Sequence, residues 1–197
     1  MKTRFGAYLP IRLVQYVLNV FKIYTRGYYI MKLDLKKAKS QFTLHEGERI
    51  SIYDRVDSFS EDLNMQQGKY ESRITSGDIM LVCQVNNKLA YRAWLSNRHL
   101  DIPKLNQGYQ DDNCVYLYDA FTIPDYRGRG LHVRMSAMRV IIGFERFKTT
   151  SGCLLVEKSN VYARKSLRKH TWVKKGILNV IKIKNSELTF QRLYNDL

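Results

Sequence analysis

The stretch FTIPDYRGRGLH, residues 121–132, places glycines and arginines directly after a strand-forming run, VYLYDA. A strand that ends in glycines and leads into a helix directs several backbone N–H groups and the positive end of the helix dipole toward one point. Gly128 and Gly130 let the backbone approach an anion closely, and Arg127 and Arg129 add positive charge. The stretch therefore predicts a phosphate or pyrophosphate site, and the alternative is a tight turn whose arginines are only solvated.

Two familiar phosphate-binding loops do not fit this stretch. A P-loop requires G-x-x-x-x-G-K-[ST], which the chain lacks. A dinucleotide fingerprint requires a third glycine and an acidic residue about twenty positions later at the end of a strand. Neither class of nucleotide site is therefore predicted.

The pattern of apolar residues predicts strands and helices on both sides of the glycine stretch. Apolar residues from Leu131 to Ile142 recur at helical spacing, and Asn160 is suited to cap a further helix. Strand, glycine turn, helix and strand in this order form one crossover, so we predict a mixed α/β domain with a mostly antiparallel sheet and one parallel crossover. The predicted strands are 41–46, 79–85, 89–96, 114–123, 152–158, 177–184 and 187–194, and the predicted helices are about 54–73, 131–147 and 161–170.

Length and composition indicate one folded unit. The chain has 197 residues, of which 45% are hydrophobic and 26% charged, values typical of a globular protein. Cys83, Cys114 and Cys153 each lie in an apolar run, and we expect buried free thiols in a reducing compartment, with no metal site. We expect a cytoplasmic location, because no apolar run approaches the ~20 residues that span a bilayer and no signal cleavage site follows the basic start.

Positive charge is concentrated at the N-terminus. The net charge is +15, and residues 1–40 supply +8 of it, with nine Lys or Arg against the single acid Asp34. Polar residues from Arg12 to Arg26 recur every three or four positions, which predicts an amphipathic helix. This helix either docks on the core with a solvated basic edge or, over residues 10–26, contacts an anionic membrane or a partner. We accordingly divide the chain into an N-terminal segment, 1–40, and a domain, 41–197.

The glycine stretch resembles a known family motif. PDYRGRGLH is similar to the acyl-CoA-binding motif of the GNAT acetyltransferase superfamily, [Q/R]-x-x-G-x-[G/A] after a strand. Residues from Arg127 to Leu131 fill its first five positions, and His132 stands where the motif has Gly or Ala. In the later block SNVYARKSLRKHTW, Asn160 and Ala163 match the next motif of the family, and its glycine is missing. The resemblance covers the chain from about Phe42 onward.

The resemblance implies a GNAT-like fold and acetyl-CoA, or another acyl-CoA, as co-substrate, with no metal. The pyrophosphate is expected on the amides of residues 128–132, and the pantetheine is expected to pair with the backbone of Phe121, Thr122 and Ile123. Asn160 is expected to contact the cofactor. Between Lys158 and Lys175 the chain has seven Lys or Arg and no acid, which suits a CoA phosphate or a solvated basic face.

Asp119 is the predicted catalytic residue. It lies where many members of the family carry an acid that faces the acceptor, as a general base or to orient the acceptor; the alternative is a carboxylate paired with a nearby Arg. The usual tyrosine acid is replaced by Leu167, so Ser166, Tyr162 or water would have to substitute. His132 is a further candidate base, although a histidine at a helix start more often packs or binds phosphate. The other histidines are interpreted as structural or surface residues: His45, His99 and His170.

The predicted activity is transfer of an acetyl group to an amine or hydroxyl of a small molecule or sugar, with a weak preference for surface glycoconjugate synthesis. The acceptor would bind near residues 54–76 and 96–113, which are rich in polar side chains. One alternative is a nucleic-acid-binding protein, supported by a pI near 9.8 and fourteen tyrosines, although no recognition motif is present. Another is a catalytically silent relative that binds CoA or a protein partner.

Overall fold

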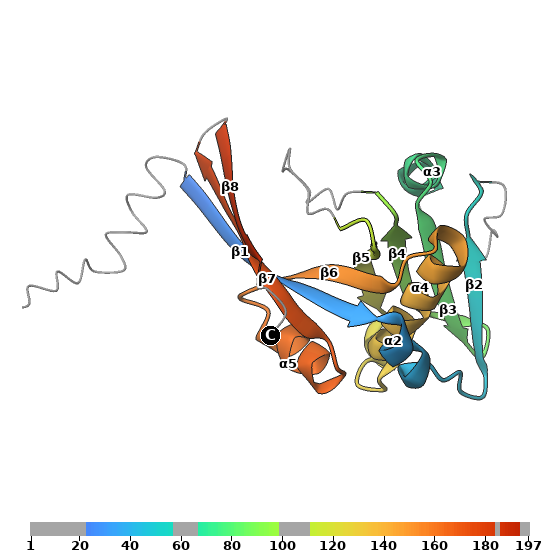
Figure 1. Ribbon diagram of the computed structural model, residues 1–197. Helices are drawn as coiled ribbons and strands as arrows, with labels where there is room; N and C mark the ends of the chain where they lie inside the picture. Colours follow the sequence, from blue (N-terminus) through green and yellow to red (C-terminus); the bar gives the residue numbers. More distant parts are fainter. Residues whose placement is uncertain (1–22, 57–66, 99–110, 184–185, 194–197) are drawn as a thin grey trace, which may run out of the picture.

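A single eight-stranded sheet organises the chain in the computed structural model, which describes residues 23–56, 67–98, 111–183 and 186–193 (Figure 1). The strand order is β2-β3-β4-β5-β6-β1-β7-β8, and every neighbouring pair is antiparallel except β5 and β6. The predicted mixed α/β fold with one parallel crossover is therefore confirmed. The strands are β1 Ile23–Asp34, β2 Glu48–Tyr53, β3 Ile79–Val85, β4 Lys88–Ser96, β5 Cys114–Thr122, β6 Ser151–Glu157, β7 Val173–Ile183 and β8 Ser186–Leu193. The helices are α2 Leu35–Gln41, α3 Gln67–Thr75, the 3-10 turn η3 Pro124–Tyr126, α4 Leu131–Phe147 and α5 Val161–Lys169.

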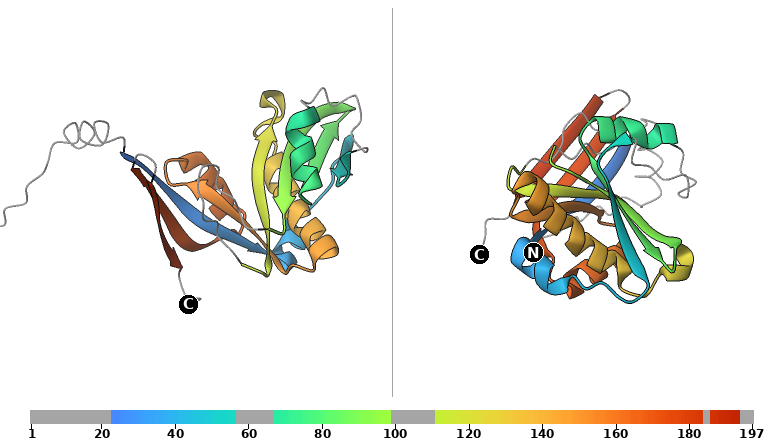
Figure 2. Two further views of the ribbon diagram at one scale, coloured as in Figure 1. Left: turned by 90° about the horizontal axis from the view of Figure 1, so that it is seen from above. Right: turned by 90° about the vertical axis from the view of Figure 1, so that its right-hand side faces the viewer.

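The sheet divides into two halves that diverge between β5 and β6. These strands pair only from Cys114 to Tyr116, whereas β5 stays paired with β4 as far as Thr122. The two halves point away from each other, with β2 to β5 on one side and β6, β1, β7 and β8 on the other (Figure 2). Among the described residues, the second half of β5 therefore has a strand partner on one edge only.

Alternating side chains give the β2 to β5 half two packed faces. Leu81 and Leu95 belong to the large core beneath α2 and α4, and Met80 and Trp94 belong to a second cluster beneath α3. This alternation is the period of two that an extended strand imposes. The sequence thus places different chemistry on the α4 side and the α3 side of the same strands.

The N-terminal prediction is wrong where the structure describes it. Residues 23–34 form β1, which pairs with β6 on one edge and β7 on the other, so they are not helical. Ile30 and Met31 are buried there, and residues 23–40 therefore belong to the sheet and its flanking helix instead of a separate segment. The rest of the predicted amphipathic helix lies outside the described residues. Among the described helices, none is long and apolar enough to cross a membrane.

The first predicted strand of the domain is also misplaced. Gln41 ends α2, which the Asp34 carboxylate caps by accepting a hydrogen bond from the Lys37 amide at 2.8 Å. The strand begins instead at Glu48, where ERISIY pairs with β3. The remaining strands from β3 onward and the helices α4 and α5 lie where the sequence predicts them, to within a few residues.

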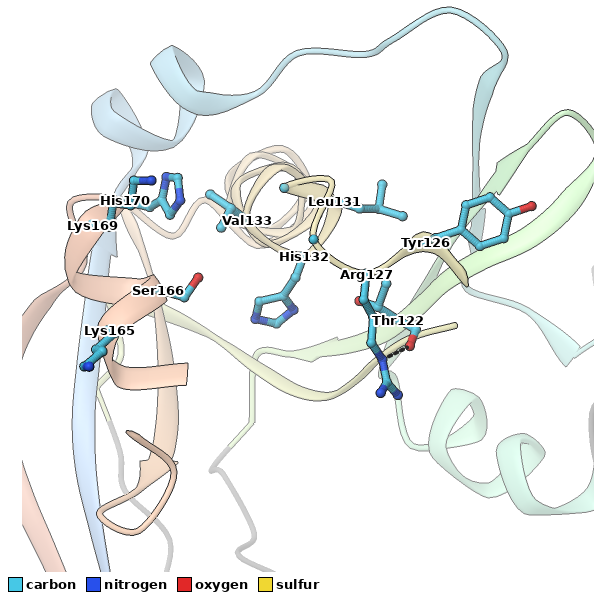
Figure 3. A pocket seen from close by; sticks show the side chains of 12 residues that line it. Thr122, Tyr126, Arg127, Leu131, His132, Val133, Lys165, Ser166, Lys169 and His170 are labelled. Carbon is cyan, nitrogen blue, oxygen red and sulfur yellow. Dashed lines mark hydrogen bonds between the residues drawn. The ribbon is translucent and has the colours of Figure 1, made fainter. Parts of the chain in front are cut away.

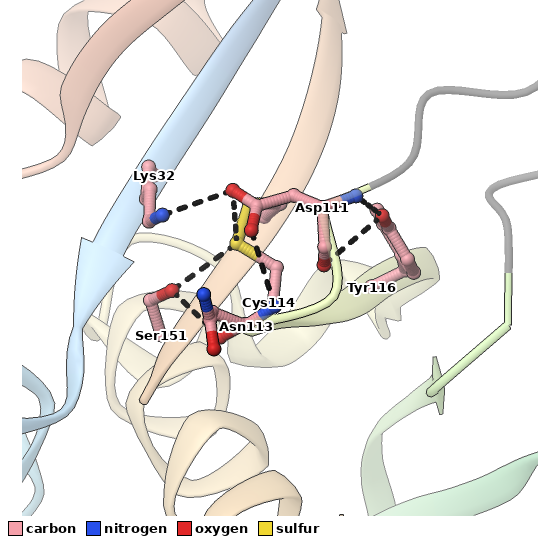
Figure 4. A network of polar contacts seen from close by, with 7 residues as sticks. Lys32, Asp111, Asn113, Cys114, Tyr116 and Ser151 are labelled. Carbon is pink, nitrogen blue, oxygen red and sulfur yellow. Dashed lines mark hydrogen bonds and ion pairs between the residues drawn. A yellow bond between two sulfur atoms is a disulfide. The ribbon is translucent and has the colours of Figure 1, made fainter. Parts of the chain in front are cut away.

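The expected free thiols are corrected in part. Cys114 and Cys153 form a disulfide with a Cα–Cα distance of 5.8 Å, and only Cys83 is a free, buried cysteine. The two half-cystines are 39 residues apart, and the parallel pairing of β5 with β6 brings them together. Around them, Asp111 pairs with Lys32 at 2.9 Å, and Ser151 donates to the Asn113 carbonyl (Figure 4). Because both sulfurs and the Asp111 carboxylate are engaged, we propose no metal site there.

Candidate active site

The glycine stretch forms a tight turn that lines a pocket of about 430 Å³ (Figure 3). Gly128 and Gly130 have φ values of 77° and 70°, in the left-handed region that favours glycine. A Cβ built on either residue would meet no other atom within 4 Å, so open space lies beside both. The pocket is lined by Thr122, Tyr126, Arg127, Gly128, Gly130, Leu131, His132, Val133, Lys165, Ser166, Lys169 and His170.

The start of α4 provides one wall of this pocket. Gly130 occupies the N-cap position and supplies no side-chain hydrogen bond to the helix. The first N–H groups of a helix have no intrahelical acceptor, and the start of this 17-residue helix lines the pocket with Gly130, Leu131 and His132, so its amides and its dipole are available to an anion there. The opposite wall is α5, which contributes Lys165 and Lys169. Backbone donors and ammonium groups thus converge on one space, an arrangement that suits a phosphate or pyrophosphate.

The two arginines of the turn are both engaged in contacts with the chain. Arg127 donates from Nε to the Thr122 carbonyl at 3.1 Å, and its guanidinium lies 5.8 Å from the Phe121 ring centroid. Arg129 stacks on Tyr126 at 5.3 Å and lines a neighbouring cavity of about 190 Å³. Across the pocket from Arg127, the positively charged side chains are Lys165 and Lys169 of α5.

His132 lies within the pocket. Its ring points from the start of α4 toward the space between α5 and the end of β5 (Figure 3) and is tilted against Tyr91 with 6.0 Å between centroids. Burial, and to a smaller extent the charge of Arg139, lower the pKa of His132 from 6.5 to about 4. His132 is therefore neutral at neutral pH and offers no positive charge to a phosphate.

The second sequence motif contributes to the pocket through other residues of its helix, α5, and not through Asn160 and Ala163. Asn160 caps α5 by accepting a hydrogen bond from the Ala163 amide at 3.0 Å, as its helix-capping prediction requires. Neither residue lines the pocket. Leu167 is buried in the core, whereas Tyr162 is 89% exposed. Of the substitute acids that the sequence suggests, only Ser166 lines the pocket.

A β-bulge places Asp119 at the end of β5. The pairing with β4 moves from Trp94 and Tyr118 to Arg92 and Phe121, so Asp119 and Ala120 are accommodated opposite one residue. Asp119 has a φ of 44°, which is uncommon for a residue other than glycine. The fully buried Arg139 donates to the carbonyls of Trp94 at 3.0 Å and Tyr118 at 3.4 Å, and so supports the bulge from the α4 side.

The Asp119 carboxylate forms an ion pair. Its Oδ2 lies 2.6 Å from Nη1 of Arg73 on α3, and the side chain remains 40% exposed. Its contact is therefore the one that the alternative predicted, a carboxylate paired with a nearby arginine, and no donor from the described residues contacts its Oδ1. Ile123 donates to the Ala90 carbonyl at 3.0 Å, and Phe121 is 39% exposed. Five of the predicted cofactor-binding residues do not line the pocket: Phe121, Ile123, Arg129, Asn160 and Ala163.

Comparison with known proteins rests on structure alone, because no family model and no curated protein matches the sequence. A GCN5-related N-acetyltransferase-like protein from Streptococcus suis matches with a TM-score of 0.54 and 14% identity over 87% of this chain. A GCN5-related N-acetyltransferase from Kribbella flavida has a TM-score of 0.54 and 11% identity over 88%. A tandem GNAT protein from the clavulanic acid biosynthesis pathway has a TM-score of 0.55 and 8% identity over 93%. This chain has the GNAT fold.

The structural match covers most of this chain but only part of the length of each neighbour. The chain spans 67%, 64% and 59% of the lengths of these three proteins, in the same order. In this chain the pocket and the bulge lie on the parallel crossover from β5 through α4 to β6. The fold thus agrees with the resemblance of the RGRG motif.

The sequence indicated the α5 side of this pocket only as a basic run from Lys158 to Lys175, with Ser166 as a substitute acid. Lys165, Ser166, Lys169 and His170 fall at spacings of one and four, so they share one face of α5. That spacing was a usable signal, although a basic stripe at this spacing is equally typical of a solvated helix. The interpretation of His170 as a structural or surface residue does not include its place in the lining.

Proposed function

We propose that the protein is an acyl-CoA-dependent acyltransferase that transfers an acetyl group from acetyl-CoA to an amine of a small molecule. The observation that carries the proposal is the pocket between the uncapped start of α4 and the lysines of α5, placed beside the point where β5 and β6 diverge. On the GNAT fold, a strand edge beside an anion site suits a ligand with a polar chain and a phosphorylated end.

Each part of the site would bind one part of acetyl-CoA. The amides of residues 128–132 would hold the pyrophosphate, with Lys165 and Lys169 adding charge. The backbone near Phe121, Thr122 and Ile123 would pair with the pantetheine along the second half of β5, although the Thr122 carbonyl already accepts from Arg127. Asn160 would act through the start of α5, which it caps.

The chemistry needs few groups from the protein. The amine nitrogen forms a bond to the thioester carbonyl carbon, the carbon–sulfur bond breaks, the amine loses a proton and the CoA thiolate takes one up. Asp119 would accept a hydrogen bond from the amine or receive its proton, directly or through water. Ser166 is the substitute acid that lines the pocket, and water is the other candidate for protonating the thiolate.

Other features of the acceptor and its surroundings are proposals that rest on sequence. The family resemblance allows a hydroxyl acceptor, and the basic N-terminus favours membrane contact through residues 10–26 and, weakly, a sugar acceptor in surface glycoconjugate synthesis. A cytoplasmic location is proposed because no apolar run is long enough to span a bilayer. A catalytically silent CoA-binding relative is the second candidate, because Leu167 is buried where the family motif has its tyrosine.

The test is isothermal calorimetry with acetyl-CoA on the wild type, Gly130→Glu and Gly77→Glu. Both glycines have positive φ values, 70° and 88°, and open space beside them, so the backbone strain is matched. Only Gly130→Glu places a carboxylate in the proposed pyrophosphate site. We expect micromolar binding by the wild type and Gly77→Glu, with at least a hundredfold loss for Gly130→Glu.

Equal binding by the two glutamate variants would contradict the pyrophosphate site. Absence of acetyl-CoA binding by the wild type, together with salt-dependent RNA binding, would instead support the nucleic-acid alternative. Binding of acetyl-CoA without turnover on any amine would support the silent relative.

A further inference from the structure

The α3 side of the sheet holds a cluster of arginines and aromatic rings beside Asp119. Arg73 lies over Trp94 and Tyr118 at 5.1 and 5.3 Å, and Arg92 lies over Tyr70 and Phe121 at 5.5 and 5.6 Å from their centroids. The rings of Tyr70 and Trp94 are 5.5 Å apart, so the two stacks are continuous. We call these residues the arginine–aromatic cluster: Tyr70, Arg73, Arg92, Trp94, Tyr118 and Phe121.

Two of the arginines on this side already have acidic partners. Arg73 pairs with Asp119 at 2.6 Å. Arg98 pairs at 2.8 Å with Asp78, a buried carboxylate that also accepts from the Tyr118 hydroxyl at 2.6 Å. Their charges are therefore balanced within the chain.

Arg92 differs from both. Among the described residues it has no carboxylate and no hydrogen-bond acceptor, and its Nη1 atom is buried without a partner. The neighbouring Trp94 is fully buried, and its Nε1 also lacks a partner in the described part of the chain. A partly buried guanidinium without a counter-charge is costly unless an anion pairs with it.

The stacking of Arg92 prepares it to bind an anion. The Tyr70 and Phe121 rings lie beside the guanidinium, 5.5 and 5.6 Å from its carbon, and its N–H groups donate in the guanidinium plane. This fork matches a carboxylate or a phosphate, which it binds through paired, charge-assisted hydrogen bonds. Because the rings restrict the side chain, little additional ordering is needed when an anion binds.

The location of Arg92 relates this anion to the transfer reaction. Arg92 on β4 is the cross-strand partner of Phe121 on β5. Phe121 follows Asp119 by two residues, so this pair is the first one beyond the bulge. A ligand on this face would meet a carboxylate at Asp119 and an unbalanced guanidinium at Arg92. The pair complements a molecule that carries an amine and an anionic group.

We infer that the acceptor is an amine that also carries a carboxylate or a phosphate, and that Arg92 binds the anionic group while Asp119 faces the amine. This inference rests on the proposed acyltransferase function and gives the substrate class. It makes Arg92 a specificity-determining residue that does not take part in the pocket of the glycine turn.

The test compares acceptors in matched pairs that differ in the anionic group. Phenylalanine is paired with 2-phenylethylamine, and glucosamine 6-phosphate with glucosamine; the two pairs separate a carboxylate from a phosphate. The rate of CoA release gives kcat/KM for the wild type, Arg92→Met and Arg92→Lys. Arg49→Gln, at an exposed position on β2, removes one arginine away from the cluster and serves as the control.

We expect the wild type and Arg49→Gln to prefer the anionic member of at least one pair by tenfold or more. Arg92→Met should reduce this preference to within about twofold, through a higher KM for the anionic member only, and Arg92→Lys should retain part of it. The member of each pair that lacks the anionic group serves as the folding control, because its kcat/KM should not change.

The outcomes separate the two proposals. A wild type that does not bind acetyl-CoA in the calorimetric titration overturns the acyltransferase function. A wild type that binds acetyl-CoA but acetylates no anionic amine, or shows no preference for one, overturns only the substrate class. If Arg92→Met keeps the wild-type preference for the anionic amine, the substrate class is likewise overturned.

Discussion

The two sides of the sheet at the end of β5 carry positive charge in different ways. On the α4 side, helix amides and the ammonium groups of Lys165 and Lys169 surround an open pocket, and His132 is held neutral. On the α3 side, the guanidinium groups of Arg73 and Arg92 lie over rings; Arg73 and Arg98 are paired with acids, whereas Arg92 has no acidic partner among the described residues. Dispersed donors suit a flexible polyphosphate, whereas a stacked arginine fixes the direction of a single anion.

The comparison assigns cofactor binding to the α4 side and acceptor chemistry to the α3 side. The bulge at Asp119 lies between them and is supported from the α4 side by Arg139 and contacted from the α3 side by Arg73. Substitutions on the two sides should therefore separate binding of acetyl-CoA from turnover.

The largest effect is expected for Asp119→Asn. The amide keeps a similar shape but cannot receive a proton and loses the charge that faces the amine, so turnover should fall about a hundredfold. The dissociation constant of acetyl-CoA, measured by calorimetry, should stay within twofold of the wild type. Unchanged turnover would remove Asp119 from the reaction.

A smaller effect is expected when His132 is replaced by Gln. The unfolded chain takes up a proton on this histidine below pH 6.5, whereas the folded chain does so only near pH 4, because burial lowers its pKa. Its contribution to stability is therefore complete above pH 6.5 and is lost as the pH falls toward 4. Between pH 7 and 5 the free energy of unfolding should fall by about 2 kcal/mol through this group.

Urea unfolding of His132→Gln at both pH values should show that this part of the decrease has disappeared. His45→Gln, at an exposed position before β2, is the control and should retain the decrease of the wild type. An equal pH dependence in all three proteins would show that His132 is not held neutral by burial.

The smallest effect is expected for the double substitution Lys165→Ala and Lys169→Ala. Removing two ammonium groups from the pocket wall should raise the dissociation constant of acetyl-CoA about tenfold and reduce its salt dependence, because exposed charges act through a screened field. The rate at saturating acetyl-CoA should not change. Lys36→Ala with Lys88→Ala removes the same charge from exposed positions elsewhere, and a similar loss there would attribute the effect to net charge.

The sequence was informative where local pattern determines structure. The glycine turn, the helix that follows it and the cap at Asn160 depend on neighbouring residues, and all are found where predicted. The motif resemblance predicted the fold because it lies on the crossover. The break between the predicted strands 79–85 and 89–96 is likewise found, as a tight turn in which Asn86 and Asn87 adopt positive φ.

The sequence was misleading where partners are distant along the chain. The start of β1 was predicted as helical because polar residues up to Arg26 recur at helical spacing, but its pairing with β7, more than a hundred residues away, outweighs that pattern. The disulfide and the stacking of Arg92 between Tyr70 and Phe121 likewise join separate strands and helices. No local spacing reports such contacts.

The central claim is that acetyl-CoA binds at the glycine turn and along the end of β5. Hydrogen exchange of the backbone amides, measured with and without acetyl-CoA, tests this most directly. We predict slower exchange in peptides covering residues 117–133 when acetyl-CoA is present, and no change around Gly77. Unchanged exchange over 117–133, with protection elsewhere in the chain, would contradict the account.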